Sequence, residues 1–121
     1  MPRVIHFEVH ADQPERAIKF YRNVFGWQVD KWPGPMDYWM IKTGEENEPG
    51  IDGAITPRDR SNTTVNTISV DSVDKYLTKV LANGGKVIQP KGPIPGVGYF
   101  AACTDSEGNM FGLMQDDPTV K

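Results

Sequence analysis

Three side chains that can bind a metal ion or move a proton occupy alternate positions near the start of the sequence: His6, Glu8 and His10. The apolar residues that alternate with them are Ile5, Phe7 and Val9. This period predicts a strand over residues 4–10 with one face on a core and the three polar side chains on the other. His6 and His10 would lie about 13 Å apart along the strand, too far to share a metal ion, whereas His6 and Glu8 could share one.

Each of these side chains has a plainer alternative role. His6 is either a binding residue or a polar residue on a half-solvated strand face. Glu8 is a candidate general base if the site is dry enough to raise its pKa, and otherwise an ion-pair partner of a Lys or Arg. His10 stands close to the next predicted helix, which favours a role as a turn or capping partner.

The same order of elements is predicted in each half of the chain. Residues 12–26 predict an amphipathic helix that begins with a capping box of Asp12 and Glu15 and ends at Gly26. In the second half a strand precedes a helix that begins at Asp71 or Ser72 and ends at residues 83–85. A strand followed by a helix therefore occurs twice.

Short strand-like runs separated by turn residues follow each helix. They cover residues 27–32, 38–43 and 51–56 in the first half, and 86–89, 98–103 and 110–115 in the second. The pattern predicts an α+β fold of two βαβββ modules in a single domain, residues 1–121. Module one covers about residues 3–56, the linker about 57–64 and module two about 65–116. Each module alone would leave sheet edges exposed, so we expect them to pack together.

Charge and composition exclude several classes of partner. The chain has 121 residues, of which 13 are basic and 16 acidic, for a formal charge of -3. It lacks the basic surface of a nucleic-acid or anionic-membrane binder, so we expect no nucleic acid and no membrane as partner. No uninterrupted apolar run at the start of the chain suggests a signal peptide or a membrane span, which favours a cytoplasmic location. The single cysteine, Cys103, cannot form an internal disulfide.

Several motifs together resemble one family. They are His6-Phe7-Glu8-Val9, the run from Pro14 to Tyr21, Phe25-Gly26-Trp27, and the turn and strand from Asp105 to Leu113. They resemble the vicinal oxygen chelate superfamily of glyoxalases, bleomycin-resistance proteins and extradiol dioxygenases, and most closely its short glyoxalase-related proteins. The resemblance implies a curved mixed sheet from each module, a cleft enclosed by the two, a homodimer and, in the enzymes, a divalent metal in the cleft.

The metal site that the resemblance implies is incomplete in this sequence. Of four ligand positions, the first falls on His6, the second in residues 53–55, the third on Val65 and the last on Gly112. Only His6 has a side chain that can bind a metal. No cofactor is therefore firmly expected, and the alternative is a weakly held divalent ion on His6 and Glu8.

The remaining cleft residues follow from the position of Gly112. Alternation places Met110 and Met114 beside it as an apolar floor, and turns Phe111 and Leu113 toward the helices. Two further candidates for the cleft are Thr67 and Trp39, of which Trp39 is either an aromatic wall or simple strand packing. Residues 90–98 are either a lid or a surface loop.

The sequence therefore predicts a glyoxalase-related protein that binds a small organic molecule in an apolar cleft, with its reaction unassigned. The first alternative is a divalent-metal-dependent lyase or isomerase of glyoxalase type, or a dioxygenase-related activity. In that enzyme His6 is a ligand, Glu8 is a ligand or base, and the partner subunit supplies the other ligands. The second alternative is a resistance-type protein that sequesters a drug or metabolite. Fold alone does not choose among these three.

Overall fold

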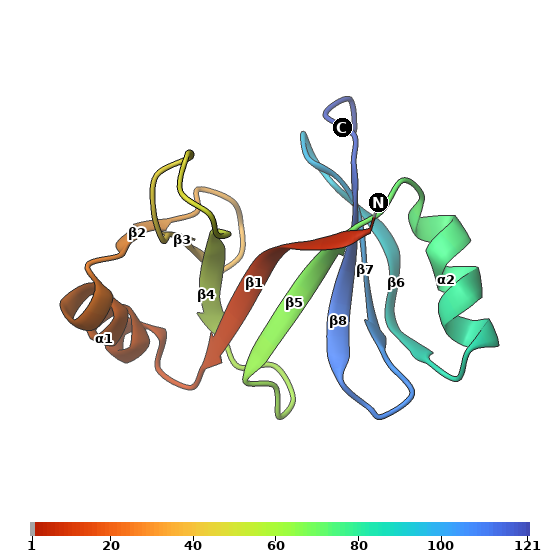
Figure 1. The fold of residues 1–121 in the computed structure, drawn as a ribbon, viewed down its shortest axis with the longest axis horizontal. Helices are drawn as coiled ribbons and strands as arrows, with labels where there is room; N and C mark the ends of the chain where they lie inside the picture. Colours follow the sequence, from red (N-terminus) through yellow and green to blue (C-terminus); the bar gives the residue numbers. More distant parts are fainter. Residues whose placement is uncertain (1) are drawn as a thin grey trace. The chain divides into compact units, whose positions relative to one another are not determined.

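The chain is described by a computed structural model covering residues 2–121, which fall into two compact units. We call residues 6–65 the N-terminal unit, and residues 66–121 with residues 2–5 the C-terminal unit. Each unit combines strands with one helix, which Figure 1 labels α1 and α2.

The N-terminal unit contains most of the first strand and the four elements that follow it. The elements are β1 (Arg3–Ala11), α1 (Pro14–Phe25), β2 (Gln28–Lys31), β3 (Trp39–Lys42) and β4 (Gly53–Pro57). β4 pairs with β1 in parallel and with β3 in the antiparallel direction, and β3 pairs with β2. The strand order is therefore β2-β3-β4-β1, a small mixed sheet.

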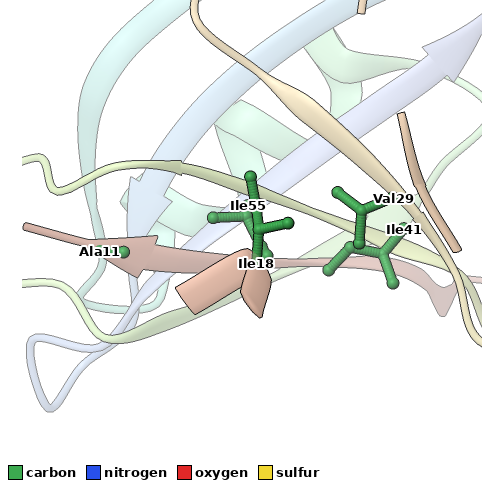
Figure 2. Close-up of a cluster of buried hydrophobic side chains, with 5 residues drawn as sticks. All are labelled: Ala11, Ile18, Val29, Ile41 and Ile55. Atoms are coloured by element: carbon green, nitrogen blue, oxygen red, sulfur yellow. The ribbon is translucent and has the colours of Figure 1, made fainter. Parts of the chain in front are cut away.

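Apolar side chains from these strands and α1 form the core of the N-terminal unit (Figure 2). The buried members are Ala11, Ile18, Val29, Ile41 and Ile55. Phe7 and Val9 of β1 pack against the same cluster. Because neighbouring side chains of a strand point to opposite faces, His6, Glu8 and His10 lie on the face of β1 that is turned away from this core.

The start of α1 differs from the prediction. The helix begins at Pro14 after Gln13, whose side chain makes no capping hydrogen bond. The predicted capping box is wrong, because Oδ1 of Asp12 instead pairs with Nε of Arg58 at 2.7 Å. The predicted end is confirmed: Gly26 follows the helix with a φ of 70°, a left-handed conformation that favours glycine.

The C-terminal unit repeats this order of elements. Its elements are β5 (Thr64–Ser69), α2 (Val73–Ala82), β6 (Lys86–Ile94), β7 (Gly98–Thr104) and β8 (Met110–Asp116). β5 pairs with β8 in parallel, and β7 is antiparallel to both β8 and β6. Of the two predicted helix caps, Ser72 is the one observed, since its Oγ accepts a hydrogen bond from the backbone N–H of Lys75.

Neither alternative for residues 90–98, a lid or a surface loop, is what the structure shows for most of this segment. Most of residues 90–98 belong to β6, which continues to Ile94 and pairs with β7 through Gly92, Pro93 and Ile94. Pro90 lies within the register shift between Gln89 and Gly92, where a residue without a backbone N–H costs no ladder hydrogen bond, whereas Pro93 pairs in register with Tyr99. Only a short turn separates β6 from β7.

The predicted fold class is confirmed, since each half supplies a strand, a helix and three further strands. Within residues 2–121, neither helix has the length and apolar character that crossing a bilayer requires.

Candidate functional site

The polar face of β1 carries the candidate site. His6 and Glu8 are half-buried, and His10 is 8% exposed. The paired strand β4 contributes Ala54 and Thr56 to the same face, since Ile55 between them packs in the core. Three groups that could exchange protons therefore follow one another along a single strand.

A fourth side chain, Tyr38, joins two of them. Its hydroxyl lies 2.7 Å from Nε2 of His6 and donates a hydrogen bond of 2.8 Å to Oε2 of Glu8. The ring of Tyr38 also stacks on that of His6, with centroids 6.3 Å apart and planes at 21°. The phenol thus connects an imidazole and a carboxylate that are neighbours on one strand face.

Contacts around the start of β3 hold Tyr38 in place. The backbone N–H of Trp32 donates to the carbonyl of Tyr38 at 2.7 Å, and the Trp32 ring meets the Tyr38 ring edge-on with centroids 6.1 Å apart. Thr56 Oγ1 donates to the carbonyl of Asp37 at 3.3 Å, which fixes the residue before Tyr38. Hydrogen bonds to the carbonyls of Asp37 and Tyr38 therefore hold the end of the loop between β2 and β3 in place.

His10 closes the other end of the group. Its Nδ1 accepts a hydrogen bond of 3.2 Å from the backbone N–H of Asp59, as expected of a turn partner. Its Nε2 lies 3.4 Å from Oε1 of Glu8, close enough for an electrostatic contact. This contact does not meet the geometry of a hydrogen bond, so the buried Nε2 of His10 has no hydrogen-bond partner within residues 2–121. Glu8 thus interacts with Tyr38 and His10, not with the predicted Lys or Arg.

Burial shifts the proton affinities of the two rings that touch. Desolvation lowers the pKa of His6, although the negative charges of Glu8 and Asp52 act in the opposite direction. Burial also raises the pKa of Tyr38, and the charge of Glu8 and its hydrogen bond add to the effect. At neutral pH both groups are therefore uncharged, and each can donate or accept a hydrogen bond.

The donor set does not fit a metal ion held in the manner of the superfamily enzymes. The Tyr38 hydroxyl occupies the position between His6 and Glu8 that a shared ion would need. Val65 and Gly112 offer no donor, and within residues 2–121 no three His, Cys, Asp or Glu side chains come together as a metal site. We therefore assign no step to a metal.

Of the other predicted cleft residues, Trp39 belongs to the N-terminal unit and Thr67, Met110, Gly112 and Met114 belong to the C-terminal unit. Trp39 packs in the apolar core of the N-terminal unit, on the opposite face of the sheet from His6, so its packing role is the one observed. Gly112 pairs with Thr67 in the C-terminal unit, where a Cβ on Gly112 would lie 2.6 Å from the Phe100 ring. Leu113 is buried on the α2 side and Phe111 packs there too, so the flanking Met110 and Met114 face the other way.

The N-terminal unit has two hollows, one of which includes a member of the polar group. One of about 200 Å³ is lined by residues 43–52, including Glu45 and Asp52. Another of about 440 Å³ lies at the start of α1, where Phe20, Tyr21 and Arg16 line it and His10 borders it. His10 is thus shared between the polar group and this second hollow.

Sequence reasoning missed Tyr38, although the alternation of β3 contains the signal. Trp39 and Ile41 are both large apolar residues at alternate positions, so both belong on the core face. Tyr38 then falls on the polar face. Because Trp39 was left open between a cleft wall and strand packing, the orientation of the strand and the face of Tyr38 were not assigned.

The chain belongs to the Glyoxalase/Bleomycin resistance protein/Dioxygenase superfamily, whose family model matches residues 3–113. The order of elements in both units agrees with this assignment, and the resemblance seen in the sequence is confirmed.

Curated relatives match most of this chain but only part of their own length. The protein named "Putative glyoxylase CFP32" of Mycobacterium tuberculosis is 29% identical over 113 residues, which cover 92% of this chain and 43% of the relative. "Probable lactoylglutathione lyase, chloroplastic" of Arabidopsis thaliana is 30% identical over 105 residues, which cover 78% of this chain and 30% of the relative. The chain thus spans less than half the length of these relatives.

Solved structures share the fold at low sequence identity. A variant of Streptomyces coelicolor methylmalonyl-CoA epimerase bound to 2-nitronate-propionyl-CoA has a TM-score of 0.70 and 14% identity, covering 98% of this chain and 97% of that one. The hypothetical protein BH1468 of Bacillus halodurans C-125 has a TM-score of 0.69 and 13% identity, covering 96% and 95%. At these identities the likeness shows the fold alone.

Proposed function

We propose that this chain binds a small organic molecule over the polar face of β1, and that it recognises this molecule without a metal ion. The observation that carries the proposal is the bridge of Tyr38 between His6 and Glu8. Small-molecule sites commonly combine apolar walls with a few fixed polar groups, and these three side chains are fixed by one another. Met40, which is 40% exposed and pairs with Ala54, adds apolar surface on the same face.

Binding can be tested with two small carbonyl compounds, hydroxyacetone and acetone. Proton–nitrogen correlation spectra of the labelled protein should show shifts on adding hydroxyacetone that centre on residues 6, 8 and 38 and persist in EDTA. In Tyr38→Phe these shifts should weaken, while in the control Tyr76→Phe they should remain, because Tyr76 lies on α2 and contacts Lys75 and Lys79. Shifts that appear only after a divalent metal is added would overturn the metal-free proposal.

A second candidate is an isomerase, epimerase or lyase that moves a proton beside a carbonyl. The names of the curated relatives and the epimerase neighbours favour it. The residue set of this chain also supports it, since an imidazole and a carboxylate are suited to general acid–base chemistry. A metal-dependent form would need ligands from a partner subunit. Metal analysis of protein purified without a metal-affinity tag separates the metal-dependent enzyme from the metal-free one. Only the metal-dependent form should contain stoichiometric metal that is lost in His6→Ala.

The third candidate is a binder that sequesters a drug or metabolite, which requires binding without turnover. It predicts that one compound binds tightly and stays chemically unchanged over hours, as followed by NMR.

We also propose a homodimer. The apolar side chains exposed on α1, namely Phe20, Val24 and Phe25, support it. Sedimentation equilibrium of the purified chain tests it, and a mass equal to one chain at all concentrations would refute it.

A further inference from the structure

The hydrogen bonds on the polar face fix where each proton lies. The phenol of Tyr38 has one proton, which it donates to Oε2 of Glu8. Its oxygen can therefore only accept from His6, so Nε2 of His6 carries a proton. A neutral imidazole has a single N–H, and burial lowers the pKa of His6. The hydrogen bonds within residues 2–121 thus leave Nδ1 of His6 as an open acceptor.

The same reasoning applies to the far end of the chain of hydrogen bonds. Nδ1 of His10 accepts from the backbone N–H of Asp59, so in the neutral ring the proton is on Nε2. That N–H is buried and lies 3.4 Å from Oε1 of Glu8. Glu8 thus accepts the phenolic proton of Tyr38 at Oε2, while the Nε2 of His10 lies near Oε1 without a hydrogen bond.

We infer that His6, Tyr38 and Glu8 form an ordered proton relay that accepts a proton from a bound molecule at Nδ1 of His6. The inference rests on the proposed function and names the chemistry of that same site. The proton of the bound molecule joins Nδ1 as the proton on Nε2 passes to Tyr38 Oη and the phenolic proton passes to Oε2 of Glu8. The electron pair of the broken bond stays on the bound molecule, so one negative charge moves from Glu8 to that molecule.

The relay avoids the charge that a lone histidine base would acquire. Protonating a half-buried imidazole places a positive charge where desolvation opposes it. In the relay His6 and Tyr38 both end neutral, because each passes on one proton and receives one. Tyr38 is therefore a positioning residue, because it connects the base His6 to the carboxylate of Glu8, with which His6 makes no hydrogen bond of its own.

The open acceptor Nδ1 of His6 limits which molecules the relay can deprotonate. An acceptor nitrogen requires a proton donor, and a carbonyl next to a C–H or hydroxyl group makes that proton more acidic. Glu8 and Asp52 both place negative charge near His6, so they disfavour an anionic group at this position. The relay thus suits a compound that is neutral at its reacting end and carries a C–H or hydroxyl beside a carbonyl.

Nitrogen-15 NMR of labelled histidine tests the proton order without any ligand. At neutral pH the His6 ring should be neutral with its proton on Nε2, and the His10 ring should carry a proton on Nε2. In Tyr38→Phe the His6 ring should lose this preference while the His10 ring keeps it, and Tyr76→Phe should change neither. A proton on Nδ1 of His6 in the unaltered protein would overturn the inference whether or not the variant folds.

Hydrogen exchange of hydroxyacetone in deuterium oxide tests the transfer itself. The protein should speed replacement of the carbon-bound hydrogens, and Tyr38→Phe or His6→Ala should lower this rate about 100-fold, a typical contribution of acid–base catalysis. Equal rates in all three proteins would overturn the relay. If hydroxyacetone shifts the spectra but exchanges no faster, the relay fails and the binding proposal stands. If the tautomers are as expected but nothing binds, the binding proposal fails.

Discussion

Tyr38 donates a hydrogen bond of 2.8 Å to Glu8 across two strands that are not neighbours in the sheet, since β4 lies between β3 and β1. Ala54 on β4 pairs with Glu8 on one side and with Met40, two residues after Tyr38, on the other. The contact therefore depends on the sheet order as well as on its two residues.

Replacing Tyr38 with phenylalanine should destabilise the protein by about 1–3 kcal/mol, because half-buried Glu8 and His6 each lose a hydrogen-bond partner. Urea unfolding measures the change. Tyr76→Phe is the matched control, and we expect it to stay within about 0.5 kcal/mol. Equal stabilities for the two variants would contradict the bridging role of Tyr38.

The two helix starts offer a comparison of caps. Ser72→Ala should cost about 1 kcal/mol, since its Oγ accepts the hydrogen bond from Lys75 N. Gln13→Ala should change stability by less than about 0.5 kcal/mol, because the Gln13 side chain makes no cap. Thermal and urea unfolding report both changes. A larger loss at residue 13 than at residue 72 would contradict the described helix starts.

Gly112 should not tolerate a side chain. In Gly112→Ala the new Cβ would lie 2.6 Å from the Phe100 ring and 3.2 Å from Thr67 Oγ1, so we expect a loss of about 1–3 kcal/mol. Gly92→Ala is the control, because the nearest atom to its Cβ lies 4.0 Å away. If the two variants unfold at the same urea concentration, the packing around Gly112 is not as described.

Stability should fall in mild acid through His6. Its pKa is lowered in the folded protein, so the unfolded chain, with the ordinary value of about 6.5, binds the proton more readily. The contribution of His6 is complete above that value and declines as the pH falls below it. A urea series across this range should show a smaller decline in His6→Gln. An increase in stability on acidification that depends on His6 would contradict the sign.

Removing the charge of Asp52 should lower the pKa of His6 further, because that charge favours the protonated ring. NMR titration of the His6 ring in Asp52→Asn measures the change. Glu46→Gln, in the same loop, is a control that should leave the titration unaltered. A higher pKa in Asp52→Asn would show that desolvation and charge have been assigned the wrong effects.

The periodicity of apolar residues predicted the fold well, because side chains that pack in the core must recur at the period of their strand or helix. Ile5, Phe7 and Val9 alternate with polar residues, and the β1 side chains of Phe7 and Val9 do pack on the apolar cluster beneath α1. The caps were harder to predict, since Asp12 and Ser72 both suit a helix start in sequence. Asp12 instead pairs with Arg58, which is 46 residues away along the chain.

The site was predicted only in part, because some of its contacts join residues that are far apart in the sequence. His6 and Glu8 share a strand face, which alternation reveals from local sequence. Their partner Tyr38 lies 30 residues beyond Glu8 and reaches it only through strand pairing. Likewise, the backbone N–H of Asp59 reaches His10 from 49 residues away. Such contacts depend on tertiary structure, which a single sequence does not reveal by periodicity.

The central claim is that His6, Tyr38 and Glu8 form a metal-free site for a small carbonyl compound. The most direct measurement is titration of the labelled protein with hydroxyacetone in EDTA, followed by proton–nitrogen spectra. We predict saturable shifts centred on residues 6, 8 and 38, with weaker shifts for acetone, which lacks the hydroxyl donor. Shifts that are absent from these residues, or that require a divalent metal, would contradict the account.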